Sequence, residues 1–167
     1  MTLHIEAAMS FSRRYAALAD SMAKREKNSQ RKTELEKIAK ICRHVPANPA
    51  RSFWEALQST WLTYAIGMVE SWGPGTSFGR PDQYLYPFYK KDMEEGKITR
   101  EQVRELLALF LIKTNEFVTP RSGEIVRTFA GHTMPANITL GGLTRDGKDA
   151  VNELSYLFLD ADKDVRL

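Results

Sequence analysis

Cysteine and long apolar runs are nearly absent from this chain. Cys42 is the only cysteine among 167 residues, so the chain can form neither an intrachain disulfide nor a thiolate metal cluster. Polar residues interrupt every apolar stretch well before the roughly 20 residues that a membrane span needs. The N-terminus carries charges where a signal peptide has an apolar core. We therefore expect a soluble, cytoplasmic protein that has no membrane partner.

Internal repeats, low-complexity stretches and clustered metal ligands are missing too. Without repeats or linkers, the chain shows no domain boundary and is expected to be one continuous piece. His4, His44 and His132 lie far apart in the sequence and lack the short spacing of metal ligands, so we assign no metal site. The composition, 43% apolar and 27% charged, is that of a globular chain with a sizeable core.

The charge is distributed unevenly along the chain. Residues 1–52 hold 11 Lys/Arg against 5 Asp/Glu, a balance of +6, whereas residues 53–167 hold 13 against 16, a balance of −3. The basic cluster consists of Lys24, Arg25, Lys27, Arg31 and Lys32. It can contact phosphate, but it has no interleaved aromatic residues and no recognition motif. A solvated helix face is the favoured interpretation, and no nucleic-acid partner is expected.

Helical periodicity dominates the first two thirds of the chain. Residues 30–42 form an amphipathic stripe that predicts a helix ending near Pro46. A second, largely buried helix extends to Ser71, where a Gly-Pro-Gly run ends it. Two starts are possible for it: Asn48-Pro49 as cap and first-turn proline, or Ser52 and Glu55 as a capping box.

A third helix and a change of texture follow. Thr99 and Gln102 form a capping box before apolar residues at helical spacing. After Pro120, residues 124–129 and 137–140 are short and β-branched, and they are predicted as strands. The turn Asp146-Gly147 leads to a last amphipathic helix. Strand followed by helix indicates the start of a β/α arrangement.

Several isolated features have a functional and a structural interpretation. Residues 142–149 resemble a phosphate loop, but Asp149 replaces its final hydroxyl, so a solvent-exposed turn is favoured. Cys42 lies on an apolar helix stripe without a nearby histidine, which favours a packed hydrophobe over a nucleophile. Glu70, Arg80 and Asp82 either orient a substrate or form an ion pair at a helix end, and the sequence leaves both open.

Five segments in the same order resemble glycyl radical enzymes of the pyruvate formate-lyase-like group. They are residues 45–58 (VPANPARSFWEALQ), 79–89 (GRPDQYLYPFY), 98–102 (ITREQ), 137–142 (NITLGG) and 146–156 (DGKDAVNELSY). The similarity covers roughly residues 40–167 and is less distinct over residues 1–39. This ordered set is much more specific than any single motif above.

The resemblance implies a fold and a chemistry. It implies an α/β barrel as the parent fold, of which this chain would be a mostly α-helical piece with a few short strands. Its expected parts are a helical lead-in (1–46), a helical scaffold with a pocket loop at 71–80 (47–120) and the start of the barrel (121–167). Family members carry a protein glycyl radical, which an iron–sulfur activating enzyme installs with S-adenosylmethionine. The radical passes to a cysteine, whose thiyl abstracts hydrogen from the substrate.

The same resemblance assigns this chain a limited part of the site. The family's cysteine motif (Gly-Cys-Val-Glu) and glycine motif (Arg-Val-Ser/Ala-Gly) are absent, so the chain is expected to hold no catalytic residue and to bind no cofactor. The substrate-binding candidates are Trp72, Thr76, Ser77 and Arg80. In the diol dehydratase branch this loop carries a His-Ser pair, and alignment on the loop glycines places Pro74 and Gly75 there. A diol substrate is therefore disfavoured relative to aryl- or alkyl-activating members or carbon–sulfur lyases.

We therefore predict part of a glycyl radical lyase or transferase, formate acetyltransferase-like. It would cleave a C–C, C–O, C–N or C–S bond and supply scaffold and one pocket loop. Expected partners are the rest of the parent chain, the radical-activating enzyme, a small-molecule substrate and a second copy in a homodimer. The alternatives are a truncated, non-catalytic helical interaction module, which predicts a cooperatively melting protein, and nucleic-acid binding, which predicts steeply salt-dependent affinity.

Overall fold

The computed structural model describes residues 2–71, 77–116, 123–128 and 136–166. Contacts between them divide the chain into two compact units, Met1–Ile66 and Gly67–Leu167. Helices account for most of the described residues, and two short strands are present. The expectation of a mostly helical piece with a few short strands is confirmed. No helix within the described ranges is both long and apolar enough to cross a membrane.

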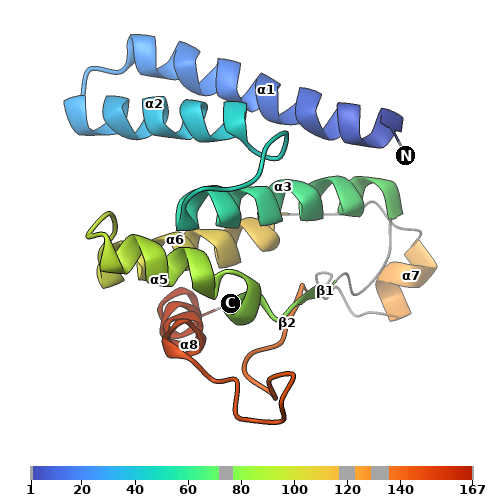
Figure 1. Cartoon of the computed structure of the whole chain (residues 1–167). Coiled ribbons are helices and arrows are strands. Elements are labelled where there is room, and N and C mark those ends of the chain that lie inside the picture. The colour runs from blue at the N-terminus through green and yellow to red at the C-terminus, as the bar shows by residue number, and fades with distance from the viewer. Residues whose placement is uncertain (1, 72–76, 117–122, 129–135, 167) are drawn as a thin grey trace. The chain divides into compact units, whose positions relative to one another are not determined.

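The first unit contains a pair of long helices that lie side by side (Figure 1). Its elements are α1 (Thr2–Arg25), α2 (Ser29–His44) and the greater part of α3 (Phe53–Ser71). The face of α1 against α2 consists of small residues, Ser12, Ala16, Ala19 and Ala23, all of which are buried. Small side chains let two helix backbones approach closely. Asn28 begins α2 by accepting a hydrogen bond from Arg31 N at 3.0 Å.

Ser12 closes the end of α2. Its hydroxyl, 1% exposed, lies 2.6 Å from the carbonyl oxygen of Cys42 and 2.8 Å from that of Val45, so its one proton serves two acceptors at the helix end. Cys42 itself is buried, and burial raises the pKa of its thiol. These contacts fit the prediction of a packed hydrophobe.

Replacing Ser12 with alanine should lower the free energy of unfolding. The carbonyls at the buried end of α2 would lose their donor, and such a loss costs about 1–3 kcal/mol. Trp54 and Trp61 pack against the cluster that contains Val45, so tryptophan fluorescence during urea unfolding reports on this region. Ser10→Ala, on the exposed side of the same helix, is the matched control. Equal urea midpoints for the two variants would contradict the role of Ser12.

The start of α3 follows one of the two predicted alternatives. The helix begins at Phe53, and Glu55 N donates to Ser52 Oγ at 3.3 Å, so Ser52 is the cap rather than Asn48. The Glu55 carboxylate accepts hydrogen bonds from Arg51 N at 2.8 Å and from Arg51 Nη2 at 2.6 Å. These bonds to Arg51 hold the pKa of the Glu55 carboxyl below its usual range.

This pKa shift predicts a pH dependence of stability. Because the folded-state pKa of Glu55 is lowered, its ionised form stabilises the protein above the unfolded-state pKa of about 4.3. That stabilisation is lost as the pH falls through the folded-state value. We expect Glu55→Gln to flatten the decline of the urea midpoint below pH 5, whereas Glu36→Gln, at an exposed site on α2, leaves the decline unchanged. Parallel pH profiles for Glu55→Gln and the parent protein would refute the assignment.

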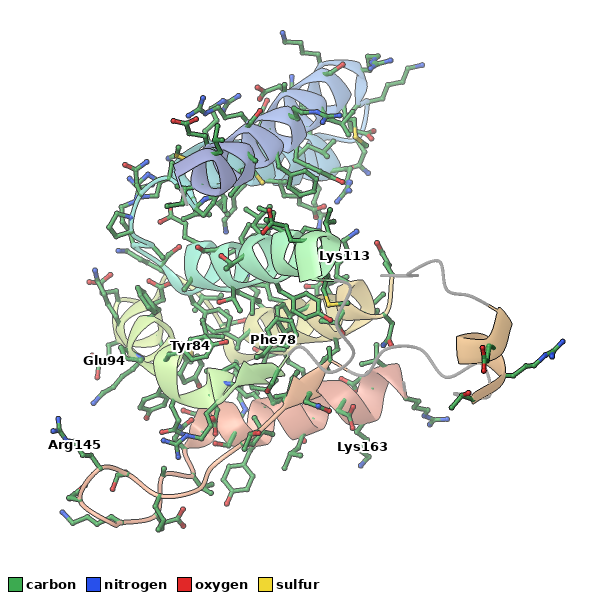
Figure 2. The ribbon with its side chains drawn as sticks, turned by 90° about the vertical axis from the view of Figure 1, so that its right-hand side faces the viewer. Phe78, Tyr84, Glu94, Lys113, Arg145 and Lys163 are labelled. Carbon is green, nitrogen blue, oxygen red and sulfur yellow. The ribbon has the colours of Figure 1, made fainter. Side chains whose placement is uncertain are left out.

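The second unit is built around the packing of two helices. Its elements after the end of α3 are β1 (Ser77–Gly79), α4 (Pro81–Tyr84), α5 (Tyr86–Glu94), α6 (Arg100–Thr114), α7 (Gly123–Thr128), β2 (Asn137–Ile138) and α8 (Glu153–Val165). α6 packs on α8, and Leu107, Leu154 and Leu157 are fully buried. Phe78 of β1 meets Phe110 of α6 with ring centroids 4.9 Å apart; Figure 2 shows Phe78 among these elements. The predicted capping box of Thr99 and Gln102 is present at the start of α6.

One predicted strand is wrong. Residues 124–129 were expected to be extended, but residues 123–128 form the short helix α7, and Phe129 lies outside the described residues. Thr128 Oγ1 donates to the carbonyl of Glu124 at 3.0 Å, a bond within one helical turn. β-Branched residues favour strands mainly through packing against a neighbouring strand. In the described ranges β1 pairs with β2, not with this segment. The other predicted strand, at residues 137–140, is present as the shorter β2.

Candidate functional site

The candidate site is the strand pair at which two distant parts of the second unit meet. β1 and β2 run parallel, and the paired residues are Ser77 with Asn137 and Gly79 with Ile138. Thr139 N donates to Gly79 O at 2.9 Å. From the first pair to the second, the chain moves two residues along β1 but only one along β2, so the register is irregular. A pair this short and irregular makes few ladder bonds.

Ser77 stands at the first position of β1 and is exposed. Its hydroxyl donates to Asn137 O at 3.2 Å and accepts from Gly79 N at 3.0 Å. The side chain therefore bridges the two strands at the end where the chain enters both of them. A hydroxyl here can still accept a further hydrogen bond from a small molecule.

Arg80 follows β1 and binds the segment that follows β2. Its Nη1 atom donates to Gly141 O and to Leu143 O, each at 2.9 Å. The side chain is partly buried. Arg80 thus positions the Gly141–Leu143 turn, and a contact between Arg80 and substrate stays a prediction.

Asp82 binds the backbone N–H of the same residue, Gly141. Its carboxylate is fully buried, and Oδ2 accepts from Gly141 N at 2.7 Å and from Ser155 Oγ at 2.5 Å. Both backbone polar groups of Gly141 are therefore bound by side chains that directly follow β1. Charge-assisted bonds of this length are among the strong ones.

Two further bonds connect α4 with the start of α8. Gln83 Nε2 donates to Ala150 O at 2.8 Å, and Asn152 Nδ2 donates to Asp82 O at 2.9 Å. Asn152 is also the N-cap of α8, where its side chain accepts from Leu154 N at 2.9 Å. We call Arg80, Asp82, Gln83, Asn152 and Ser155 the interstrand clamp.

The turn that the clamp holds contains two glycines, Gly141 and Gly142, in backbone conformations that suit glycine. Gly141 and Gly142 have φ angles of +67° and +85°, a region that L side chains rarely adopt. A Cβ atom on Gly142 would lie 2.9 Å from Arg80 Nη1, and one on Gly141 would lie 2.7 Å from Val151 Cγ2. Glycine at both positions allows the close approach that the hydrogen bonds require.

The structure brings together only part of the predicted site. Ser77 and Arg80 lie at β1, whereas Trp72 and Thr76 lie outside the described residues. Asp82, which sequence reasoning left open between a substrate contact and an ion pair, binds a backbone amide and a hydroxyl instead. Asn152 and Ser155 were not singled out from the sequence. Their spacing is that of a helix cap, which locates the start of α8 but not its link to Asp82.

The alternative motifs have structural roles where they are described. Thr144, Asp146 and Lys148 form a turn in which Lys148 Nζ lies 2.9 Å from Asp146 Oδ2, in agreement with the exposed-turn interpretation. Figure 2 shows Arg145 at the outer end of this loop, away from the helices. His44 Nε2 lies 2.9 Å from Pro49 O. Among the described residues, no group of three or more potential ligands is placed to hold a metal ion.

Three of the five segments that carry the family resemblance meet at the clamp. They are residues 79–89, 137–142 and 146–156, which contribute Asp82, Gly141 and Ser155 to one hydrogen-bonded group. Three of the segments that carry the resemblance thus supply one hydrogen-bonded group.

The fold matches part of the fold of solved glycyl radical enzymes. The chain belongs to the pyruvate formate lyase-like family, whose sequence model matches residues 1–167, and the predicted family is confirmed.

Individual relatives are similar over nearly the whole chain. Isethionate sulfite-lyase from Oleidesulfovibrio alaskensis is 41% identical over an alignment of 167 positions, which covers 97% of this chain and 20% of the relative. A structure concerning 1,2-propanediol dehydration in Roseburia inulinivorans matches with a TM-score of 0.94 and 40% identity, over 97% of this chain and 20% of that one. A glycyl radical enzyme from Archaeoglobus fulgidus matches with a TM-score of 0.91 and 44% identity, over 97% and 21%. This chain therefore spans about a fifth of the length of the relatives that it matches.

Proposed function

We propose that this chain is the scaffold and one pocket edge of a glycyl radical lyase or transferase. The observation that carries the proposal is the match of residues 1–167 to the pyruvate formate lyase-like family. The radical glycine and the thiyl cysteine would come from other parts of the polypeptide. In this proposal residues 1–46 lead in, residues 47–120 form the scaffold with the pocket loop at 71–80, and residues 121–167 begin the barrel.

The residues proposed to face substrate are Trp72, Thr76, Ser77 and Arg80. A tryptophan can stack on or shape an apolar part of a substrate, and hydroxyls can orient a polar one. The exposure of Ser77 at the start of β1 supports its place in this set. The partners proposed are the rest of the polypeptide, a small-molecule substrate, a second copy in a homodimer and an S-adenosylmethionine iron–sulfur enzyme that installs the radical.

Among the possible bonds, we propose C–S cleavage ahead of diol dehydration. Two observations support this order: the relative at 41% identity is an isethionate sulfite-lyase, and Pro74 and Gly75 occupy the loop positions where the resemblance places the His-Ser pair of diol dehydratases. Proline and glycine side chains offer no hydrogen-bonding groups to substrate hydroxyls. A single cysteine in 167 residues supports a reducing, cytoplasmic location.

The test uses the full-length polypeptide that contains this segment, activated without oxygen in the presence of an activating enzyme and S-adenosylmethionine. Electron paramagnetic resonance should detect a glycyl radical that is absent when S-adenosylmethionine is omitted. With isethionate and 1,2-propanediol as separate probes, kcat/KM for sulfite release from isethionate should exceed kcat/KM for propanal release from the diol by at least about tenfold. No radical would refute the enzyme proposal, and faster turnover of the diol would refute the proposed bond type alone.

A further inference from the structure

The complete burial of the Asp82 side chain requires an explanation. This ionisable side chain is 0% exposed, and its second oxygen, Oδ1, has no hydrogen-bond partner in the part of the chain that the structure describes. A buried carboxylate is costly unless its geometry is well satisfied. A leucine would avoid that cost but would leave the N–H of Gly141 and the hydroxyl of Ser155 without their acceptor. The groups that the carboxylate binds therefore explain its presence.

What it contributes is a fixed place for Gly141. The N–H of Gly141 is bound by Asp82 and its C=O by Arg80, so this one residue is held through the peptide groups on both of its sides. Ser155 donates to the same Asp82 oxygen at 2.5 Å, which fixes the carboxylate relative to α8. The Asp82 carboxylate thus joins three segments of the chain, at residues 80–82, 141 and 155.

Asp82 and Gly141, which form this contact, follow the C-terminal ends of β1 and β2. Ser77 and Asn137, the first residues of β1 and β2, form the opposite end. A few hydrogen bonds connect the two strands, among them Thr139 N to Gly79 O and Ser77 Oγ to Asn137 O. The register between them is irregular, and so short a pair makes few ladder bonds that could fix it. The side-chain hydrogen bonds of the clamp join the segments that follow the two strands, so they are placed to set this register.

We propose that Asp82 is a positioning residue of the pocket: by fixing Gly141, it sets the register of β1 against β2 and hence the place of Ser77 at the pocket edge. This inference rests on the proposed function, in which Ser77 faces substrate. Asp82 itself is buried and touches no substrate. Its contribution is to hold the pocket edge within the narrow tolerance that substrate binding requires.

The decisive comparison is between two substitutions of Asp82 in the full-length protein. Asp82→Ala removes the acceptor. Asp82→Asn keeps one acceptor oxygen, which can take the place of Oδ2, while its amide nitrogen takes the place of the oxygen that has no described partner. Asp162→Asn, at an exposed site on α8, is the control for loss of a carboxylate elsewhere in the unit.

Kinetics should separate positioning from simple destabilisation. With whichever probe the parent protein turns over, isethionate or 1,2-propanediol, Asp82→Ala should raise KM by about tenfold or more while kcat per radical changes less than about threefold. Asp82→Asn should recover most of that loss. A residue with a merely structural role would reduce the amount of active, radical-bearing protein and leave KM unchanged. Equal KM values for Asp82→Ala and Asp162→Asn would overturn the inference.

Hydrogen exchange of the unactivated full-length protein provides a readout that does not depend on catalysis. Asp82→Ala should accelerate exchange in residues 137–143 by about tenfold or more, because the amides of Thr139 and Gly141 lose their support. Asp82→Asn should accelerate it much less. Unchanged exchange in Asp82→Ala would overturn the inference whatever the activity. Absence of a radical in the activated parent protein would instead overturn the proposed function.

If Asp82→Ala does not fold, Ser155→Ala tests the same contact more gently. It removes one of the two donors to Asp82 Oδ2 and leaves the Gly141 bond in place. An increase in KM and in the exchange of residues 137–143, each smaller than the tenfold effects above, supports the inference. No change in either measurement overturns it.

Discussion

Replacement of Leu107 by alanine should lower the free energy of unfolding of the second unit by about 2–5 kcal/mol. Leu107 is fully buried on α6, the helix that packs on α8. Removing its isobutyl group forfeits the transfer free energy of the lost carbons and leaves a cavity that close-packed neighbours fill only partly. Urea unfolding followed by far-ultraviolet circular dichroism measures the loss. Hydrogen exchange of α6 and α8 locates it.

Leu109→Ala is the matched control for this prediction. It makes the same chemical change on the same helix, but the Leu109 side chain is 52% exposed, so its truncation should cost less than about 1 kcal/mol. A difference between the two variants isolates burial from helix propensity, which is identical for both. Similar urea midpoints would mean that the α6–α8 contact is not the core of this unit.

The sequence was most informative where structure depends on neighbouring residues. The capping box of Thr99 and Gln102, the cap at Ser52 and the helix over residues 30–42 each depend on residues within one or two turns. Such signals can be interpreted without knowing the tertiary fold. The burial of Cys42 followed from the same periodicity, since the apolar stripe of a helix faces the core.

Local structure was predicted wrongly or missed where it depends on a contact with a residue that is distant in the sequence. The predicted strand at residues 124–129 includes three β-branched residues, yet residues 123–128 form α7, because a strand forms only where another strand lies beside it. The role of Asp82 was equally hidden, since Gly141 and Ser155 are 59 and 73 residues away in the sequence. The family resemblance covers the segments that contain Asp82, Gly141 and Ser155. Only the structure shows that they meet in the clamp.

This meeting explains why the candidate site cannot be derived from spacing alone. Ser77 and Arg80 are close in sequence, yet their hydrogen-bond partners, Asn137 and Gly141, come from the segment that follows α7. The pocket edge proposed above therefore depends on both strands and on their junction. A substitution of Gly141 or Ser155 is expected to affect the proposed pocket edge as much as a substitution of Arg80 or Asp82.

Gly141→Ala should destabilise the second unit by about 2–4 kcal/mol, because two unfavourable effects coincide at this residue. The φ angle of +67° is disfavoured for alanine, at a cost of about 1–2 kcal/mol. The new Cβ would also lie 2.7 Å from Val151 Cγ2, and relieving that overlap moves the peptide that Asp82 and Arg80 hold. Urea unfolding gives the stability change, and hydrogen exchange of residues 137–143 should rise with it.

Gly147→Ala separates the two effects. Gly147 has a φ angle of +79°, but no atom lies within 4 Å of a Cβ built there, so only the backbone cost of about 1–2 kcal/mol applies. Its exposed turn also lies outside the interstrand clamp. Exchange in residues 137–143 should therefore stay near that of the parent protein. If Gly141→Ala and Gly147→Ala are equally destabilised and exchange alike in residues 137–143, the close approach at Gly141 does not hold the strand junction in place.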